Sequence, residues 1–280
     1  MGLTKRIAAV VIPLGLVVGG VAYGVSRHTA GDDKTLGECR VKVRGLSVVL
    51  TDTQARNASL VAAIAIRRGM PAHAATVGIA TALQESKLYN LRGGDRDSLG
   101  LFQQRPSQGW GTRAQVLDPV YAINAFYDAL EKVSGWQTMP VTRAAQRVQR
   151  SAFPDAYGTY ENDGRALASA LTGYSPRAFT CHLPGPGDHR LPAVRRATEV
   201  RDALAPAFGP LTPTVGGGGE IQVPVSSRSR GWALASYLVA RAQALDLSYV
   251  SYAGIVWSTD SNRGWQPAER TRDLSRVSVG

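Results

Sequence analysis

The chain has 280 residues, of which 44% are hydrophobic and 19% charged, a composition typical of a globular protein with a sizeable core. Its 32 lysines and arginines outnumber 21 acidic residues, and the net charge of +11 favours anionic partners such as nucleic acid, anionic lipid or anionic cell-wall polymers. Because the basic residues are scattered and only 7% of the residues are aromatic, the pattern argues against a nucleic-acid-binding protein.

The N-terminus combines a positive tip with a long apolar run. Lys5 and Arg6 precede residues 7–25, which only Pro13 and several glycines interrupt. Such a run is about long enough to cross a bilayer as a helix, and the preceding charges favour an N-terminus inside and the bulk of the chain outside. The sequence therefore predicts a cytoplasmic tip and transmembrane anchor over 1–27, a polar stalk over 28–38 and a location at the cell membrane. A cleaved signal peptide, which would give a secreted protein, is the alternative.

The next part of the chain shows mainly helical signals. Thr51 and Gln54 fit a capping box, Pro71 suits the first turn of a second helix, and Asp118 precedes a first-turn proline. The expected elements are an extended strand over 39–50, helices over 51–69 and 71–85, a strand or tight loop over 99–104, and helices over 118–135, 143–152 (capped by Thr142) and 162–171.

The two cysteines of the chain, Cys39 and Cys181, bracket this helical part. In an oxidising exterior we expect them to form one disulfide that joins the first and last segments of a domain, and two unrelated buried thiols are the alternative. Two distant cysteines and four scattered histidines show no metal-ligand spacing, so we expect neither a metal nor a cofactor.

The C-terminal third begins with a proline-rich stretch that ends in four consecutive glycines, which is typical of a flexible linker. A short charged helix is predicted inside it, over 193–205. The remaining residues predict a strand over 221–225, a helix over 232–245 and a strand over 249–257. The predicted domains are therefore a first domain over 39–181, a linker over 182–219 and a small α+β unit over 220–280.

Glu85 is the leading candidate for a catalytic group. General acid catalysis near neutral pH needs a group that is still protonated there, whereas an ordinary glutamate has a pKa of about 4.3. The negative end of the second helix and the apolar neighbours Ala82 and Leu83 would both raise the pKa of Glu85. The alternative is an ordinary solvated carboxylate at a helix end.

A second motif follows Glu85-Ser86 by about fifteen residues, as Gly100-Leu101-Phe102-Gln103. Together the two resemble the Glu-Ser and Gly-Leu-Met-Gln signature of the lysozyme-like lytic transglycosylases and goose-type lysozymes, in an actinobacterial, membrane-anchored cell-envelope subgroup. The segment that begins at Asp118-Pro119 is similar to the family's next block, so the resemblance spans roughly 54–173.

The resemblance implies a fold, a substrate and a mechanism. The expected fold class is mainly α: a lysozyme-like α+β domain with a small β insert, after one N-terminal transmembrane helix and before the small C-terminal unit. The expected substrate is the glycan strand of peptidoglycan. The expected mechanism uses Glu85 as a single acid/base and an intramolecular attack that gives an anhydro-sugar.

Further side chains are candidates for holding the sugar. Ser86, Gln103 and Gln104 offer hydrogen-bonding groups close to Glu85 in the sequence. The family carries a Tyr-Asn pair on a later helix, where this chain has Val148 and Gln149. Gln149 and Tyr157 complete the predicted substrate-binding set. Tyr157 could supply the missing hydroxyl from another position. Aromatic faces suit sugar rings, so Trp110 and Trp136 are candidates for the walls of a cleft. Arg105 is a further candidate for these walls.

Two aspartates leave the mechanism open. Asp95 or Asp97 could serve as the second carboxylate of a lysozyme-type hydrolase, but aspartate is also a favoured turn residue that could pair with Arg96 or Arg105. Besides the hydrolase, the alternatives are a non-catalytic peptidoglycan-binding or scaffold protein, and a part of a secretion or transfer apparatus with partners in the envelope.

Overall fold

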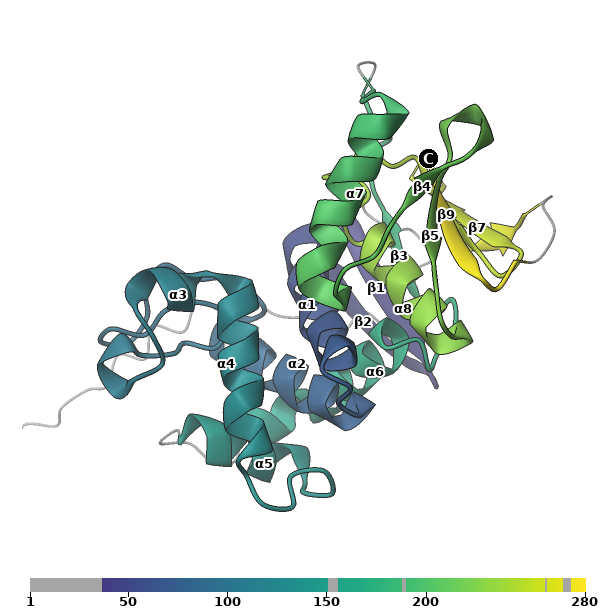
Figure 1. The fold of residues 1–280 in the computed structure, drawn as a ribbon. Helices are drawn as coiled ribbons and strands as arrows, with labels where there is room; N and C mark the ends of the chain where they lie inside the picture. Colours follow the sequence, from purple (N-terminus) through teal and green to yellow (C-terminus); the bar gives the residue numbers. More distant parts are fainter. Residues whose placement is uncertain (1–36, 151–155, 188–189, 260, 269–272) are drawn as a thin grey trace, which may run out of the picture.

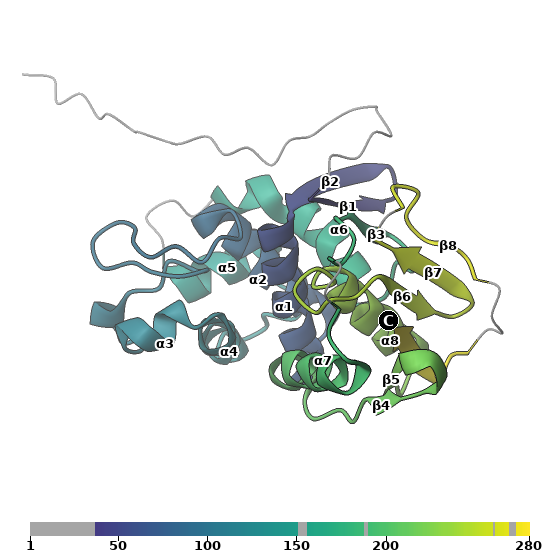
Figure 2. The ribbon, with the colours of Figure 1, turned by 90° about the horizontal axis from the view of Figure 1, so that it is seen from above.

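A computed structural model describes residues 37–150, 156–187, 190–259, 261–268 and 273–280. This part of the chain forms eight α-helices and nine strands, and the strands make two antiparallel sheets (Figure 1). Helices α3, α4 and α5 lie at the end of the molecule away from the larger sheet, and α1, α2 and α6 lie between them and the smaller sheet (Figure 2). A single contiguous core joins residues from Cys39 to Val279.

The helices are α1 (Asp52–Arg67), α2 (Ala72–Ser86), α3 (Arg113–Leu117), α4 (Pro119–Glu131), α5 (Val141–Gln149), α6 (Glu161–Leu171), α7 (Ala193–Phe208) and α8 (Arg228–Val239). The strands are β1 (Glu38–Val43), β2 (Leu46–Thr51), β3 (Phe179–His182), β4 (Thr214–Val215), β5 (Ile221–Pro224), β6 (Tyr249–Tyr252), β7 (Ile255–Ser258), β8 (Gln266–Pro267) and β9 (Arg276–Val279).

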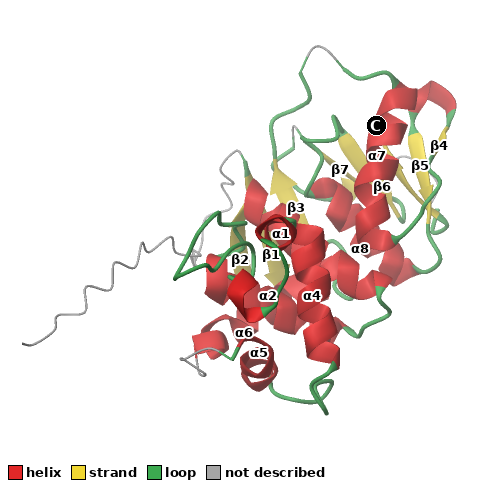
Figure 3. Cartoon of the chain, turned by 60° about the vertical axis from the view of Figure 1, so that its left-hand side comes forward, coloured by secondary structure: helices red, strands yellow, loops and turns green. Residues whose placement is uncertain are grey.

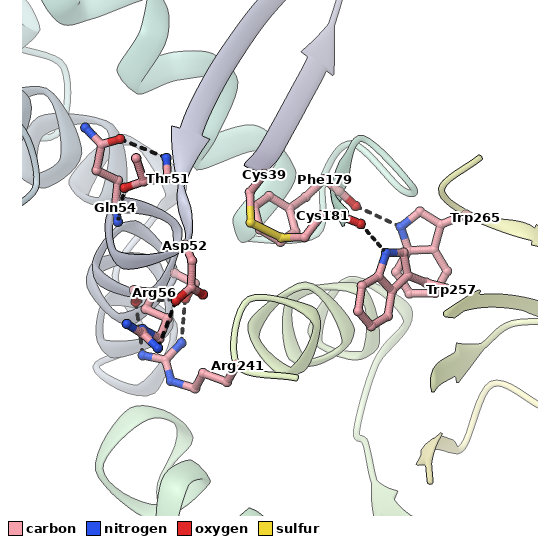
Figure 4. Close-up of a disulfide and its surroundings, with 11 residues drawn as sticks. Cys39, Thr51, Asp52, Gln54, Arg56, Phe179, Cys181, Arg241, Trp257 and Trp265 are labelled. Carbon is pink, nitrogen blue, oxygen red and sulfur yellow. Dashed lines mark hydrogen bonds and ion pairs between the residues drawn. A yellow bond between two sulfur atoms is a disulfide. The ribbon is translucent and has the colours of Figure 1, made fainter. Parts of the chain in front are cut away.

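The smaller sheet has the order β2-β1-β3, and its central strand β1 pairs antiparallel with both neighbours. Cys39 and Cys181 are direct register partners on β1 and β3, and their sulfurs form the predicted disulfide (Figure 4). The predicted extended strand over 39–50 is a hairpin, which turns at Arg44 and Gly45 in left-handed backbone conformations. The disulfide therefore joins two strands that the sheet already holds side by side.

The central helices pack closely because small residues face one another. Helix α1 begins with the predicted capping box between Thr51 and Gln54. Helix α2 packs against α1, α5 and α6 and is buried along most of its length. A Cβ atom added at Gly164 on α6 would lie 3.0 Å from the Cβ of Ala80, so α6 approaches α2 at a distance that only a glycine allows.

Of the two helix caps predicted for the peripheral helices, one is present in the structure and one is not. Asp118 caps α4 by accepting hydrogen bonds from the backbone nitrogens of Val120 and Tyr121, as predicted. The prediction that Thr142 caps the following helix is wrong, because α5 begins at Val141 with Pro140 before it. Proline provides the extended conformation that starts a helix without a side-chain cap.

The larger sheet has the order β4-β5-β9-β6-β7-β8, and its strands gather at one end of the molecule (Figure 3). Helix α8 packs against β6 and β9 and also against α1 and α6. Two indole nitrogens of this part bind the smaller sheet: Trp257 donates to the carbonyl of Cys181 and Trp265 to that of Phe179, each at 2.8 Å (Figure 4). The two sheets are therefore connected by direct hydrogen bonds beside the disulfide.

The stretch predicted as a linker, 182–219, contains ordered elements. Helix α7 packs against α1, and Tyr237 of α8 donates a hydrogen bond to the carbonyl of Ala203 on α7 at 2.8 Å. The glycines at its end form a turn between β4 and β5. The domain boundaries themselves stay a prediction.

The predicted fold class is wrong. The described residues form an α+β structure with a six-stranded sheet, rather than a mainly α protein, and the expected insert after α2 contains isolated bridges instead of a sheet. The described helices include none that is long and apolar enough to span a membrane. The predicted anchor over 1–27 lies outside the described residues. The sheet was missed because strands far apart in the sequence, such as β5 and β9, pair with one another.

Candidate functional site

Glu85 occupies the last turn of α2, where the chain leaves the helix in an unusual way. Lys87 and Leu88 both have left-handed backbone conformations, with φ of 54° and 62°. Two amide side chains of α1 hold this exit: Gln54 donates to the carbonyl of Lys87 at 2.9 Å, and Asn57 donates to that of Leu88 at 2.7 Å. Helix α1 thereby sets the direction of the chain directly after the candidate acid.

The pKa of Glu85 is raised above its ordinary value. Burial of the half-buried carboxylate is the largest cause, and hydrogen bonds from Tyr157 and Gln149 and the charge of Lys87 act in the opposite direction. The hydroxyl of Tyr157 donates to Oε1 of Glu85 at 2.6 Å. The sequence predicted Tyr157 as a possible source of the missing hydroxyl, and the structure brings it to the carboxylate.

Tyr157→Phe is expected to raise the pKa of Glu85 further. The tyrosine hydroxyl donates to the charged form of the carboxylate, so its loss removes a contact that favours ionisation. We expect the ¹³C resonance of the Glu85 carboxyl to titrate at a higher pH in this variant than in the wild type. Tyr174→Phe, at a side chain that is 70% exposed, is the control and should leave the titration unchanged. A lower pKa in Tyr157→Phe would contradict the role assigned to the hydroxyl.

The turn that follows the Gly-Leu-Phe-Gln motif is tied to α2 and α5. The hydroxyl of Ser86 is buried and lies within hydrogen-bond distance of the carbonyls of Leu101, at 2.7 Å, and Ala82, at 3.1 Å. Gln149 donates to the carbonyl of Phe102 at 2.7 Å. Ser86 and Gln149, predicted to bind substrate, therefore bind the backbone of this turn and position it beside Glu85, and Gln149 also hydrogen-bonds the Glu85 carboxylate.

The two glutamines of this motif differ in their surroundings. Gln103 is half-buried in a left-handed conformation, with φ of 47°, and its side chain donates to the carbonyl of Gly100 at 3.2 Å. Gln104 is only 2% exposed and donates to the carbonyl of Ala122 at 3.3 Å. Gln103 thus lies nearer the surface, whereas Gln104 holds α4 against the turn.

The glycines near this turn make room for atoms of the protein itself. A Cβ atom at Gly94 would clash with Oε1 of Gln103, and one at Gly100 would clash with the carbonyl oxygen of Val116. Gly100 also has a positive φ of 76°. These glycines therefore allow close packing within the loop.

The two candidate second carboxylates have different environments. Asp97 accepts hydrogen bonds from Nε of Arg105 and from the backbone nitrogen of Ser107, each at 2.8 Å, and these hold its pKa well below the usual range. The side chain of Asp95 is 90% exposed, with Arg96 at 4.0 Å. Asp97 therefore holds the loop in its conformation through Arg105 and Ser107. This ion pair with Arg105 is the structural role that the sequence offered as the alternative to a catalytic one.

The tryptophans proposed as cleft walls are not equivalent. Trp136 is 5% exposed and stacks on His73, with ring centroids 6.3 Å apart, near the start of α2 and therefore at the opposite end of that helix from Glu85. Trp110 is partly buried against the core. Trp136 thus belongs to the core, and Trp110 is the one with exposed surface for a ligand.

Sequence reasoning missed two residues that shape the site. Gln54 was interpreted only as a helix cap, although its other amide atom binds the exit of α2. No local motif assigns Asn57 to the exit of α2. Both act on residues more than thirty positions away, so the signal that could have revealed them is the packing of α1 on α2 rather than any local motif.

Among the described residues, no group of three or more His, Cys, Asp or Glu side chains is placed to hold a metal ion. The groups that act on the Glu85 carboxyl are the phenol of Tyr157, the side-chain amide of Gln149 and the charge of Lys87. Comparison of the chain with known protein families finds no match. Comparison with curated proteins finds no significant match either.

Proposed function

We propose that the chain cleaves the glycan strands of peptidoglycan, with Glu85 as the single general acid and base. The observation that carries this proposal is the half-buried Glu85 carboxyl, which has a raised pKa and accepts a 2.6 Å hydrogen bond from Tyr157. A carboxyl in this state keeps its proton to a higher pH than an exposed glutamate. The motif resemblance to lytic transglycosylases supports the same assignment.

In this mechanism Glu85 first donates its proton to the glycosidic oxygen as the bond to the anomeric carbon breaks. The carboxylate that remains then takes a proton from a hydroxyl of the same sugar, which attacks the anomeric carbon and closes an anhydro ring. The proton is returned to Glu85, so the two steps balance without water. Tyr157 stabilises the carboxylate between the steps, because its hydroxyl donates to the charged form.

The environment of the aspartates favours this single-acid mechanism over hydrolysis. A base or nucleophile for hydrolysis must face the sugar with a free carboxylate. Both oxygens of Asp97 already accept hydrogen bonds, from Arg105 and Ser107, and Asp95 is largely in solvent. The hydrolase therefore remains the less favoured alternative.

Removing either aspartate should change the rate little. We expect Asp95→Asn and Asp97→Asn to cut purified peptidoglycan at rates within about tenfold of wild type, since general acid catalysis by Glu85 is retained. In both variants the products, identified by mass, should carry anhydro ends. Reducing ends from the wild type that disappear in either variant would instead support a two-carboxylate hydrolase. A binding or scaffold protein would release no product from any of them.

We further propose that this activity takes place outside the cytoplasm, at the cell envelope. The disulfide between Cys39 and Cys181 supports that compartment, because such bonds persist in oxidising surroundings. The net charge of +11 is also suited to an anionic wall. Partners in the envelope, including a secretion apparatus for which local wall cleavage makes room, fit the same location.

A further inference from the structure

A pocket lies where the smaller sheet meets the segment before β8. It has a volume of about 730 Å³. Its floor is the face of β1 and β3 opposite the core: Cys39, Val41 and Phe179 are buried, whereas the alternate residues of the same strands line the pocket. The hydrogen bond from Trp265 to the carbonyl of Phe179, at 2.8 Å, holds the other wall in place (Figure 4).

The lining of this pocket is strongly basic. Arg40 and Lys42 contribute from β1, Arg177 from the residues before β3, and Arg263 from the segment between β7 and β8. Glu38 is the one acidic neighbour with a defined contact among the described residues, and it pairs with Arg40 at 2.8 Å. Arg40, Arg177 and Arg263 therefore give the pocket a basic lining, which favours an anion.

One cation of this lining, on the floor of the pocket, is largely buried. Arg40 is 8% exposed, and its Nε has no hydrogen-bond partner within the described part of the protein. The hydroxyl of Thr180, the register partner of Arg40 on β3, is likewise buried without a partner there. Arg40 and Thr180 both line the pocket, so its floor is polar as well as charged.

We propose that this pocket binds the phosphate group of an organic phosphate ester. Guanidinium groups form paired hydrogen bonds with phosphate oxygens, and three of the four cations are arginines. The volume exceeds what a phosphate group alone requires, and the indole of Trp265 provides an apolar surface for the organic part. A phosphate polymer of the envelope and a single phosphorylated molecule share this chemistry.

The site is independent of the proposed catalysis. Its residues come from β1, β3 and the segment before β8, whereas the side chains that hydrogen-bond Glu85 are Tyr157 and Gln149. Glu85→Gln should therefore bind the same phosphate ligands as the wild type. Failure of one proposal leaves the other in place.

Calorimetric titration of the full chain tests the phosphate site. The probes are inorganic phosphate, glycerol 3-phosphate, a glycerol-phosphate oligomer and poly-glutamate. We expect glycerol 3-phosphate to bind the wild type, and Arg177→Gln/Arg263→Gln to weaken it at least roughly tenfold through the loss of two charge-assisted contacts. Arg143→Gln, an exposed arginine of α5, is the matched control and should bind like the wild type.

The probes separate the sources of the phosphate. Tighter binding of the oligomer than of glycerol 3-phosphate assigns the site to a polymer, and equal binding assigns it to a single ester. Poly-glutamate binding as tightly as the oligomer would overturn the preference for phosphate. Equal binding by the wild type and the double variant, or no binding of any phosphate probe to the wild type, would overturn the site itself. Both arginines are exposed, so the double variant should unfold at the wild-type temperature.

Discussion

Glu85→Gln is expected to slow peptidoglycan cleavage by about 10²- to 10⁴-fold, the usual contribution of a positioned general acid. The amide cannot donate the proton to the glycosidic oxygen, but its oxygen can still accept the hydrogen bond from Tyr157. The variant should therefore keep its fold while it loses turnover. Glu199→Gln, at an exposed carboxylate of α7 that lies 3.9 Å from Arg195, is the matched control and should cleave at the wild-type rate.

The same variant should reveal the raised pKa through its stability. Because burial raises the pKa of Glu85 in the folded state above its unfolded value, the protonated form stabilises the fold at low pH, and this contribution is lost as the pH rises through the raised pKa. Glutamine carries no charge at any pH. We therefore expect thermal unfolding of wild type and variant to coincide near pH 4 and the variant to melt at the higher temperature at pH 8. A variant that melts lower at pH 8 would show that ionised Glu85 is stabilised by its neighbours.

Removal of the disulfide should have the largest effect on stability. The bond closes a loop of 142 residues, and in the chain-entropy model a loop of this length contributes about 4 to 5 kcal/mol. We expect Cys39→Ala/Cys181→Ala to lower the free energy of unfolding in guanidinium chloride by about this amount. Both sulfurs are buried, so the double alanine variant also loses packing.

Reduction of the wild type separates these two effects, because it breaks the bond and removes no atoms. The free energy of unfolding of the reduced protein should lie between that of the oxidised wild type and that of the double variant. Unfolding curves that coincide with and without reductant would mean that the bond does not destabilise the unfolded state, and would contradict the entropic contribution.

The features predicted correctly from the sequence are those set by nearby residues. Thr51 and Gln54 form a capping box within one turn, and Asp118 caps α4 directly before its first residue. The disulfide was predictable because the chain has two cysteines and no other partner for either. Each of these depends on a local pattern or a simple count.

The features that were missed depend on contacts between distant segments. Ile221 pairs with Val279, so neither strand shows its place in the six-stranded sheet in its own sequence. The same limit applied at the site: Glu85 was identified from its motif, but the contact with Tyr157, 72 residues later, was only one possibility among several. The role of Gln54 and Asn57 at the end of α2 depends on helix packing that no motif records.

The central claim, that Glu85 acts as the acid of a glycan-cleaving site, is tested most directly by one digestion. The full-length wild type, Glu85→Gln and Glu199→Gln are incubated separately with purified peptidoglycan, and the released fragments are identified by mass. The proposal predicts anhydro-muropeptides from the wild type and Glu199→Gln, and release at least about a hundredfold slower from Glu85→Gln. Fragments released equally by Glu85→Gln, or wall binding without release by the wild type, would contradict it.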